Sequence, residues 1–80
     1  MLLLGSNRLT CIQSLQDLRQ LEVLEVQSNQ ITDISFVNSM SSLQFLNLED
    51  NLLVKIPALF GLDNLIELNL KKNMVLRLIT

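Results

Sequence analysis

The side chains that could support acid–base, nucleophilic or metal chemistry are few in this sequence. It has no histidine, one cysteine and two glycines. It therefore lacks Ser-His and Cys-His nucleophile pairs, the ligands of a zinc site and a glycine loop for phosphate. The remaining charged groups to consider are the carboxylates Glu22 and Glu25, the pair Glu49-Asp50 and the doublet Lys71-Lys72. Nothing in their spacing indicates a desolvated acid–base pair, so we expect a protein that is not an enzyme and uses no metal or cofactor.

Composition and charge narrow the class of partner. The 80 residues are 49% hydrophobic and 18% charged, which favours a folded domain over a disordered chain. The net charge is −2, and the absence of Trp and Tyr leaves few aromatic rings for base stacking. We therefore expect no nucleic-acid partner. The opening "MLLLGSNRL" is too short in its apolar run for a signal peptide or a membrane span, so we expect no membrane partner either.

The single cysteine bears on the compartment. Cys11 has no second cysteine for an intrachain disulfide, and the sequence contains no Asn-X-Ser/Thr acceptor site. Both features suit a reducing compartment, so we expect a cytoplasmic protein, with nuclear and ciliary or cytoskeletal locations left open. Cys11 could be a redox thiol, but the interpretation as a small surface or half-buried residue is favoured.

The apolar residues indicate a repeat and not a helix. Ile12, Leu15, Leu18, Leu21 and Leu24 are spaced by three. A helical residue turns about 100°, so four such steps carry the apolar stripe about 240° around the axis. A stable helix face needs mixed steps of three and four. The helix interpretation therefore fails on geometry.

A period of 22 residues explains the pattern. The segments "LLLGSNRLTCI", "LEVQSNQITDI", "LNLEDNLLVKI" and "LNLKKNMVLRL" align without a gap, and an asparagine lies at the same position in each. Leu24 and Val26 should point into the core of a short strand, whereas Val23, Glu25 and Gln27 should point outward. The matching asparagines, one in each copy, are Asn7, Asn29, Asn51 and Asn73.

The motifs "LEVLEVQSNQI", "LQFLNLEDNLL" and "LIELNLKKNMV" resemble the leucine-rich-repeat signature L-x-x-L-x-L-x-x-N-x-L. The 22-residue period resembles the class that includes the regulatory subunit of protein phosphatase 1. Some stretches, such as "GLDNLIELNL", also resemble the leucine-rich-repeat subunit of the tubulin polyglutamylase complex. The resemblance implies an α/β repeat solenoid, a right-handed coil with short parallel strands on its concave face and loops or 3₁₀ turns on its convex face.

The same resemblance implies a structural role for the four asparagines, which we call the Asn ladder (Asn7, Asn29, Asn51 and Asn73). Each would turn inward and bond backbone groups that the bending chain leaves unpaired. Apolar residues after the ladder position should then close the coil on its convex side, and Pro57 and Gly61 should discourage a long helix there. In the second repeat the closing residues are Ile31, Ile34, Val37 and Met40.

The whole chain is expected to form one segment of about 3.5 repeats. Its boundaries fall at 1–20 (partial), 21–42, 43–64 and 65–80 (partial). Terminal repeats normally carry a polar outer face, whereas "MLLL" and "MVLRLIT" are apolar. We therefore expect a segment of a longer solenoid that lacks end caps.

The outward positions define where a protein partner would bind. In a solenoid these positions line the concave face, which is the usual binding surface of repeat arrays. They form four columns, one residue from each repeat. The columns are Met1, Val23, Phe45, Glu67; Leu3, Glu25, Asn47, Asn69; Gly5, Gln27, Glu49, Lys71; and Ser6, Ser28, Asp50, Lys72.

The columns leave two pairs of interpretations open. Glu49 with Lys71, and Asp50 with Lys72, are lateral neighbours that could pair with each other or contact a partner, with self-pairing favoured. Glu25 has no cation beside it in its column, so it is the better partner contact. The apolar group Met1, Leu3, Val23 and Phe45 could pack laterally or form a binding hot spot.

The sequence therefore predicts a non-catalytic protein-binding scaffold without a small-molecule substrate. The resemblance implies that it regulates or targets a partner enzyme, such as a phosphatase or a tubulin-modifying complex. The alternative is a structural spacer within a longer solenoid. The outward residues expected at the protein-binding face are Val23, Glu25, Gln27, Phe45, Asn47, Glu49, Asp50, Glu67, Asn69, Lys71 and Lys72.

Overall fold

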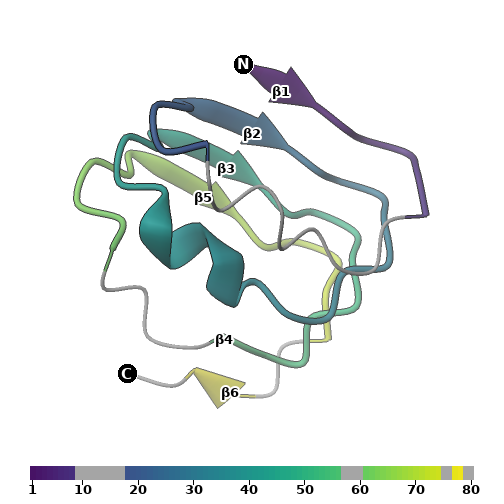
Figure 1. Cartoon of the computed structure of the whole chain (residues 1–80). Helices are drawn as coiled ribbons and strands as arrows, with labels where there is room; N and C mark the ends of the chain where they lie inside the picture. Colours follow the sequence, from purple (N-terminus) through teal and green to yellow (C-terminus); the bar gives the residue numbers. More distant parts are fainter. Residues whose placement is uncertain (9–17, 57–60, 75–76, 79–80) are drawn as a thin grey trace.

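The structure is a computed structural model that describes residues 1–8, 18–56, 61–74 and 77–78. Its main feature is a four-stranded parallel sheet in the order β1-β2-β3-β5, seen side by side in Figure 1. Each strand is short because a single coil spends few residues on this side of the molecule. The strands are β1 (Leu2–Leu3), β2 (Val23–Glu25), β3 (Phe45–Asn47) and β5 (Glu67–Asn69).

The register of the sheet follows the 22-residue period. Leu2 pairs with Leu24, Leu24 with Leu46 and Leu46 with Leu68. Each partner is the equivalent residue of the next repeat, so the predicted columns are confirmed along the strands. The alternation of burial is also confirmed, since Leu24 and Val26 are fully buried while Val23, Glu25 and Gln27 are only half-buried. Together with its open edges, this parallel sheet fits a repeat solenoid.

The asparagines bond the backbone at the ends of the strands. Asn51 Nδ2 donates to the carbonyl oxygen of Leu48 in its own coil at 3.0 Å and to that of Val26 in the preceding coil at 3.1 Å. Asn51 Oδ1 accepts a hydrogen bond from the backbone N–H of Ile31 at 3.1 Å. One side chain thus satisfies backbone groups of two coils, and Asn51 is only 4% exposed.

The other rungs repeat this geometry. Asn29 Nδ2 donates to Val26 O and to Leu4 O, while Asn73 Nδ2 donates to Leu70 O and to Leu48 O. Asn7, in the first coil, donates to Leu4 O and Gly5 O of its own coil and is exposed. The Asn ladder therefore joins successive coils where the chain leaves the sheet.

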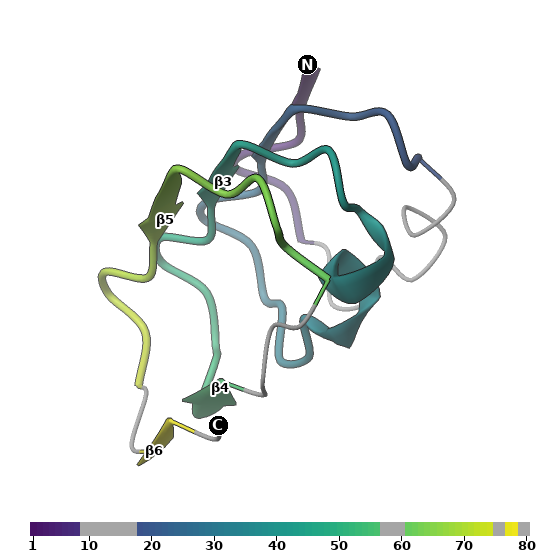
Figure 2. The same cartoon turned by 90° about the vertical axis from the view of Figure 1, so that its left-hand side faces the viewer.

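The convex side of the second repeat is closed by a 3₁₀ helix. This helix, η2 (Ser35–Ser39), packs across the coil from the sheet, as Figures 1 and 2 show. The four predicted closing residues of this repeat are fully buried, as expected. Phe36 is buried as well, although it belongs to no repeated apolar column. The buried core is Leu24, Val26, Ile31, Ile34, Phe36, Val37, Met40, Leu43, Leu46, Leu48 and Leu53.

A second, two-stranded parallel sheet was not predicted. It pairs β4 (Lys55–Ile56) with β6 (Arg77–Leu78), away from the main sheet (Figure 2). The register again follows the period, because Lys55 pairs with Arg77 and Ile56 with Leu78. Adjacent coils therefore pair through parallel strands on two sides of the molecule, once in the main sheet and once in this second sheet.

The structure gives a reason for glycine at position 61 that the sequence analysis did not predict. A Cβ added there would overlap the carbonyl oxygen of Asn38 in η2. The position therefore needs glycine for a close approach of two backbones, in addition to any effect on helix length. Pro57, the other residue of that prediction, lies outside the described residues.

Replacing Asn51 with Ala should lower the free energy of unfolding by about 1–3 kcal/mol, because the buried N–H of Ile31 loses its side-chain acceptor and the carbonyl oxygens of Val26 and Leu48 each lose one of two asparagine donors. Chemical denaturation followed by circular dichroism measures the change. Asn7→Ala is the matched control, since that side chain is exposed and bonds its own coil. Equal losses for the two variants would contradict the role of the buried rung.

Replacing Gly61 with Ala should destabilise the fold by about 1–3 kcal/mol, because backbone atoms must move apart to admit the methyl group. Gly5→Ala tests the alternative of a side-chain clash. Its Cβ would come 2.7 Å from Gln27 Nε2, the end of a flexible side chain that can rotate away. Thermal melting should therefore show the larger loss at position 61, and a larger loss at position 5 would refute the explanation.

Candidate functional site

The outward side chains of the main sheet form one surface, which we call the strand face. The pairs Val23–Phe45 and Phe45–Glu67 are lateral partners, as are Glu25–Asn47 and Asn47–Asn69. Parallel strands lie about 4.8 Å apart, so each of these side chains has its column neighbours within reach. The first two predicted columns are therefore adjacent in space. The strand face comprises Leu3, Val23, Glu25, Phe45, Asn47, Glu67 and Asn69.

The third column, which includes Gln27, Glu49 and Lys71, follows the strands, and the Glu49 carboxylate in it contacts side chains of the next coil. Asn69 Nδ2 donates to Glu49 Oε1 at 2.8 Å, and Glu49 Oε2 lies 4.0 Å from Lys72 Nζ. The predicted lateral pair of Glu49 with Lys71 is therefore wrong, because the ion pair runs diagonally to Lys72. This ion pair is weak, since Lys72 is 73% exposed.

The fourth column does not lie on the strand face. Ser6, Ser28, Asp50 and Lys72 have φ between 57° and 59°, in the left-handed region. They form the turn that directs the next residue, a ladder asparagine, into the core. The predicted pairing of Asp50 with Lys72 is also not seen, because the Lys72 ammonium lies against Glu49. Asp50 Oδ2 instead accepts a hydrogen bond from Ser28 Oγ at 3.2 Å. Sequence reasoning treated this column as strand because its residue types carry no glycine signal for the turn.

The apolar group of the strand face is exposed to different degrees. Phe45 is 38% exposed, Val23 is half-buried, and Met1 and Leu3 are strongly exposed at the first coil. Lateral packing therefore covers Val23 while it leaves Phe45 accessible. An accessible aromatic ring in the centre of a sheet is a suitable anchor for a partner.

A hollow with a volume of about 110 Å³ surrounds Phe45. Pockets for drug-sized molecules measure about 300–1,000 Å³, so this one suits a single side chain of a partner and not a free metabolite. We call it the Phe45 hollow. Its lining residues are Val23, Leu24, Glu25, Phe45, Leu46, Asn47, Glu67 and Asn69.

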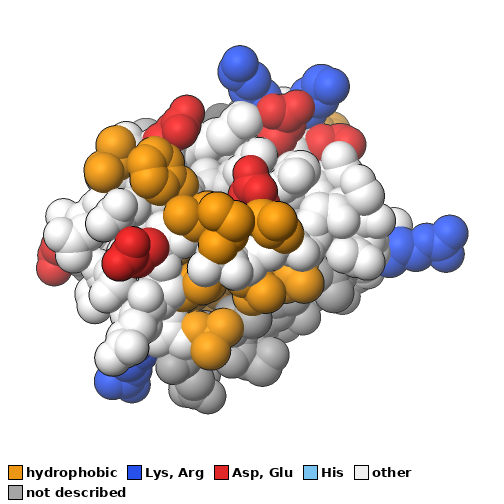
Figure 3. Space-filling view, turned by 90° about the horizontal axis from the view of Figure 1, so that it is seen from above, with side chains coloured by type: hydrophobic (Ala, Val, Ile, Leu, Met, Phe, Trp, Pro, Cys, Tyr) orange, Lys and Arg blue, Asp and Glu red, His pale blue; other side chains and the backbone are white. Residues whose placement is uncertain are grey.

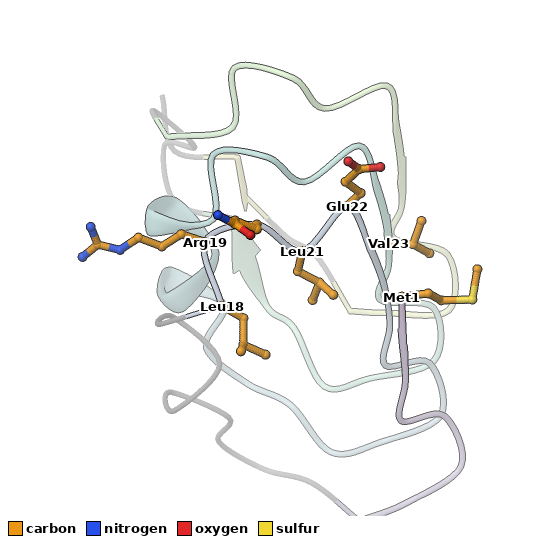
Figure 4. Close-up of a pocket in the computed structure, with 7 residues that line it drawn as sticks. Met1, Leu18, Arg19, Leu21, Glu22 and Val23 are labelled. Carbon is orange, nitrogen blue, oxygen red and sulfur yellow. The ribbon is translucent and has the colours of Figure 1, made fainter.

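A second hollow, missed by sequence reasoning, lies at the first coil (Figure 4). Its wall is the segment that leads into β2, together with Met1. Met1 and Val23 project to the same side in Figure 4, whereas Arg19 points away from them. Leu18 is 43% exposed there, whereas Met40, the equivalent residue of the next repeat, is fully buried.

The surface seen from above, at the β1 end, separates the side-chain types (Figure 3). Apolar side chains occupy its middle, carboxylates border them, and Lys and Arg side chains lie at the periphery. Among the described residues, no three Cys, Asp or Glu side chains gather to hold a metal ion. Within the same ranges, no helix has the length and apolar character needed to cross a membrane. Cys11 lies outside the described residues.

Comparison with known families agrees with the repeat pattern. Residues 1–39 match the family model described as leucine rich repeats (2 copies). A search of curated proteins finds no match to the chain. The family match and the open parallel sheet together support a leucine-rich-repeat protein. Repeats of this family are generally non-catalytic modules that bind other proteins, which supports a protein-binding scaffold.

The left-handed turn can be tested at Lys72. Lys72→Val should lower the free energy of unfolding by about 1–2 kcal/mol relative to Lys72→Asn, because asparagine tolerates a positive φ and a β-branched residue does not. Both variants remove the ion pair with Glu49, so their difference isolates the backbone. Urea denaturation measures it, and equal midpoints and slopes would show that the turn is unstrained.

Proposed function

We propose that this chain is a non-catalytic scaffold that uses its strand face to bind a protein partner and thereby regulates or targets a partner enzyme. The observation that carries the proposal is the Phe45 hollow, where an accessible aromatic ring lies between carboxylates on neighbouring strands. Aromatic anchors in the centre of a surface supply much of the binding energy in protein interfaces. The leucine-rich-repeat match supports the same class of function.

The construction of the strand face supports a binding role. The core is formed by the inward side chains of each strand, such as Leu24 and Leu46, which are almost completely buried. The outward side chains are therefore not needed to fill the core. Their types can vary with the partner while the backbone that presents them stays the same.

The class of partner enzyme that we propose rests on a family resemblance of the 22-residue repeat. That period resembles the class that includes the regulatory subunit of protein phosphatase 1, so a phosphatase catalytic subunit is the first partner that we propose. A tubulin-modifying complex is the second. We propose that a scaffold of this kind acts in the cytoplasm. The nucleus and the cilium or cytoskeleton are the alternative locations.

The test compares two double variants of equal chemistry. Glu25→Lys with Phe45→Ala changes the strand face, whereas Asp63→Lys with Met74→Ala makes the same kinds of change at exposed residues outside the Phe45 hollow. Immobilised wild-type and variant chains are incubated with cell extract and with the purified catalytic subunit of protein phosphatase 1. Retained proteins are quantified by mass spectrometry.

The strand-face variant should retain the partner at least about tenfold less than the wild type, because a hot-spot residue contributes about 2 kcal/mol or more to binding. The control variant should retain it as the wild type does, and both variants should keep the wild-type circular dichroism spectrum. Equal retention by all three chains would indicate a structural spacer. Retention of other proteins without the phosphatase subunit would refute the phosphatase role alone.

A further inference from the structure

The Phe45 hollow has two carboxylates that no other described side chain neutralises. Glu25 lies on β2 and Glu67 on β5, the two strands that flank β3. No side-chain hydrogen bond or ion pair joins either carboxylate to another side chain in the described part of the molecule. Glu49 differs, because Asn69 and Lys72 both contact its carboxylate.

Between these carboxylates lie an aromatic ring and an amide. Phe45 lies beside Glu67 in the register of the sheet, and Asn47 lies beside Glu25. Asn47 Oδ1 accepts a hydrogen bond from the backbone N–H of Glu49 at 3.0 Å, which fixes the orientation of this amide. Its Nδ2 group is thus turned away from that bond and is available as a donor to a partner's carbonyl oxygen.

These four side chains define the chemistry of the occupant. A cation is attracted by the face of an aromatic ring and by carboxylates on either side of it. The hollow is too small for a drug-sized ligand, as its volume is about 110 Å³. The occupant is therefore the charged end of a long side chain, delivered from above the strand face.

We propose that the Phe45 hollow binds the guanidinium group of an arginine side chain of the protein partner. The group stacks on Phe45 and donates hydrogen bonds to Glu25 and Glu67, while Asn47 Nδ2 donates to the partner's backbone. Arginine is favoured over lysine because its planar group stacks on an aromatic ring and presents donors in several directions to two carboxylates at once. This assignment rests on the proposed function, because it assumes a protein partner at the strand face. It adds that the partner presents an arginine there.

The experiment titrates the full chain with Nα-acetyl-arginine amide and follows backbone amides by ¹H–¹⁵N NMR. The matched probe is Nα-acetyl-citrulline amide, which has nearly the same shape but an uncharged urea in place of the guanidinium. The arginine probe should give saturable shifts centred on Glu25, Phe45, Asn47 and Glu67. Because a single small ligand contributes few contacts, the dissociation constant should be about millimolar.

Variants distinguish the hollow from general attraction to an acidic surface. Glu67→Gln and Phe45→Ala should each weaken binding about fivefold, which corresponds to one exposed cation–π or charge contact. Glu22→Gln is the control, because this carboxylate lines the other hollow and not the Phe45 hollow. It should leave the dissociation constant within about twofold of the wild type.

Each of the following results would overturn the proposal. Equal binding of the citrulline probe would show that charge is not recognised. Equal binding of Nα-acetyl-lysine amide would show that any cation suffices. Equal weakening by Glu22→Gln would show that the attraction is spread over the surface. If the arginine probe fails while partner capture still depends on Glu25 and Phe45, the proposed function stands and this assignment falls.

Discussion

The structure depends on backbone groups that a repeating coil leaves unpaired where each strand ends. A main-chain carbonyl buried without a partner costs free energy comparable to a lost hydrogen bond. The Asn51 side chain resolves this at one point by bonding Val26 O, Leu48 O and the N–H of Ile31. Because one amide spans two coils, it requires equivalent atoms of neighbouring coils to lie side by side, and so it holds the register of the sheet to the 22-residue period.

The Asn ladder also explains why the residue before each asparagine has a positive φ. Each asparagine must leave the strand and enter the core within a few residues, and a left-handed residue makes that turn. The cost of a positive φ at a residue other than glycine is about 1–2 kcal/mol. A buried asparagine with two or three hydrogen bonds offsets that cost. The turn and the ladder are therefore one structural unit, and polar residues such as Ser28 and Asp50 belong to it.

The repeat made much of this architecture predictable. A strict period places equivalent residues in columns, so the sequence alone assigns Leu24 and Leu46 to the core and Val23 and Phe45 to the surface. The period does not predict packing contacts that occur in only one repeat. Phe36 is buried in η2 without an equivalent in the repeat pattern, and Gly61 is required by the backbone of Asn38. Such contacts depend on how the convex segment of one coil packs against that of the next. The alignment of repeats into columns does not describe this packing.

Side-chain pairing was harder to predict than side-chain position for a related reason. Columns give lateral neighbours, but a long side chain also reaches diagonal ones, and Lys72 contacts Glu49 in this way. The columns therefore located the charges near the strand face correctly and assigned two of the pairs wrongly. The left-handed φ of Lys72 explains the error, since a residue in the turn projects its side chain differently from a residue in a strand.

In the complex that we propose, this division of charge would make the strand face selective. Glu49 already has Asn69 and Lys72, so a partner that covers it need not supply a cation. Glu25 and Glu67 have no such neighbours among the described side chains, and burying an unpaired carboxylate costs several kcal/mol. A wholly apolar partner would gain the contact with Phe45 but leave both carboxylates desolvated. In the proposed complex, a partner with a cation at that point would avoid the penalty, so Glu25 and Glu67 would favour a cationic surface over an apolar one.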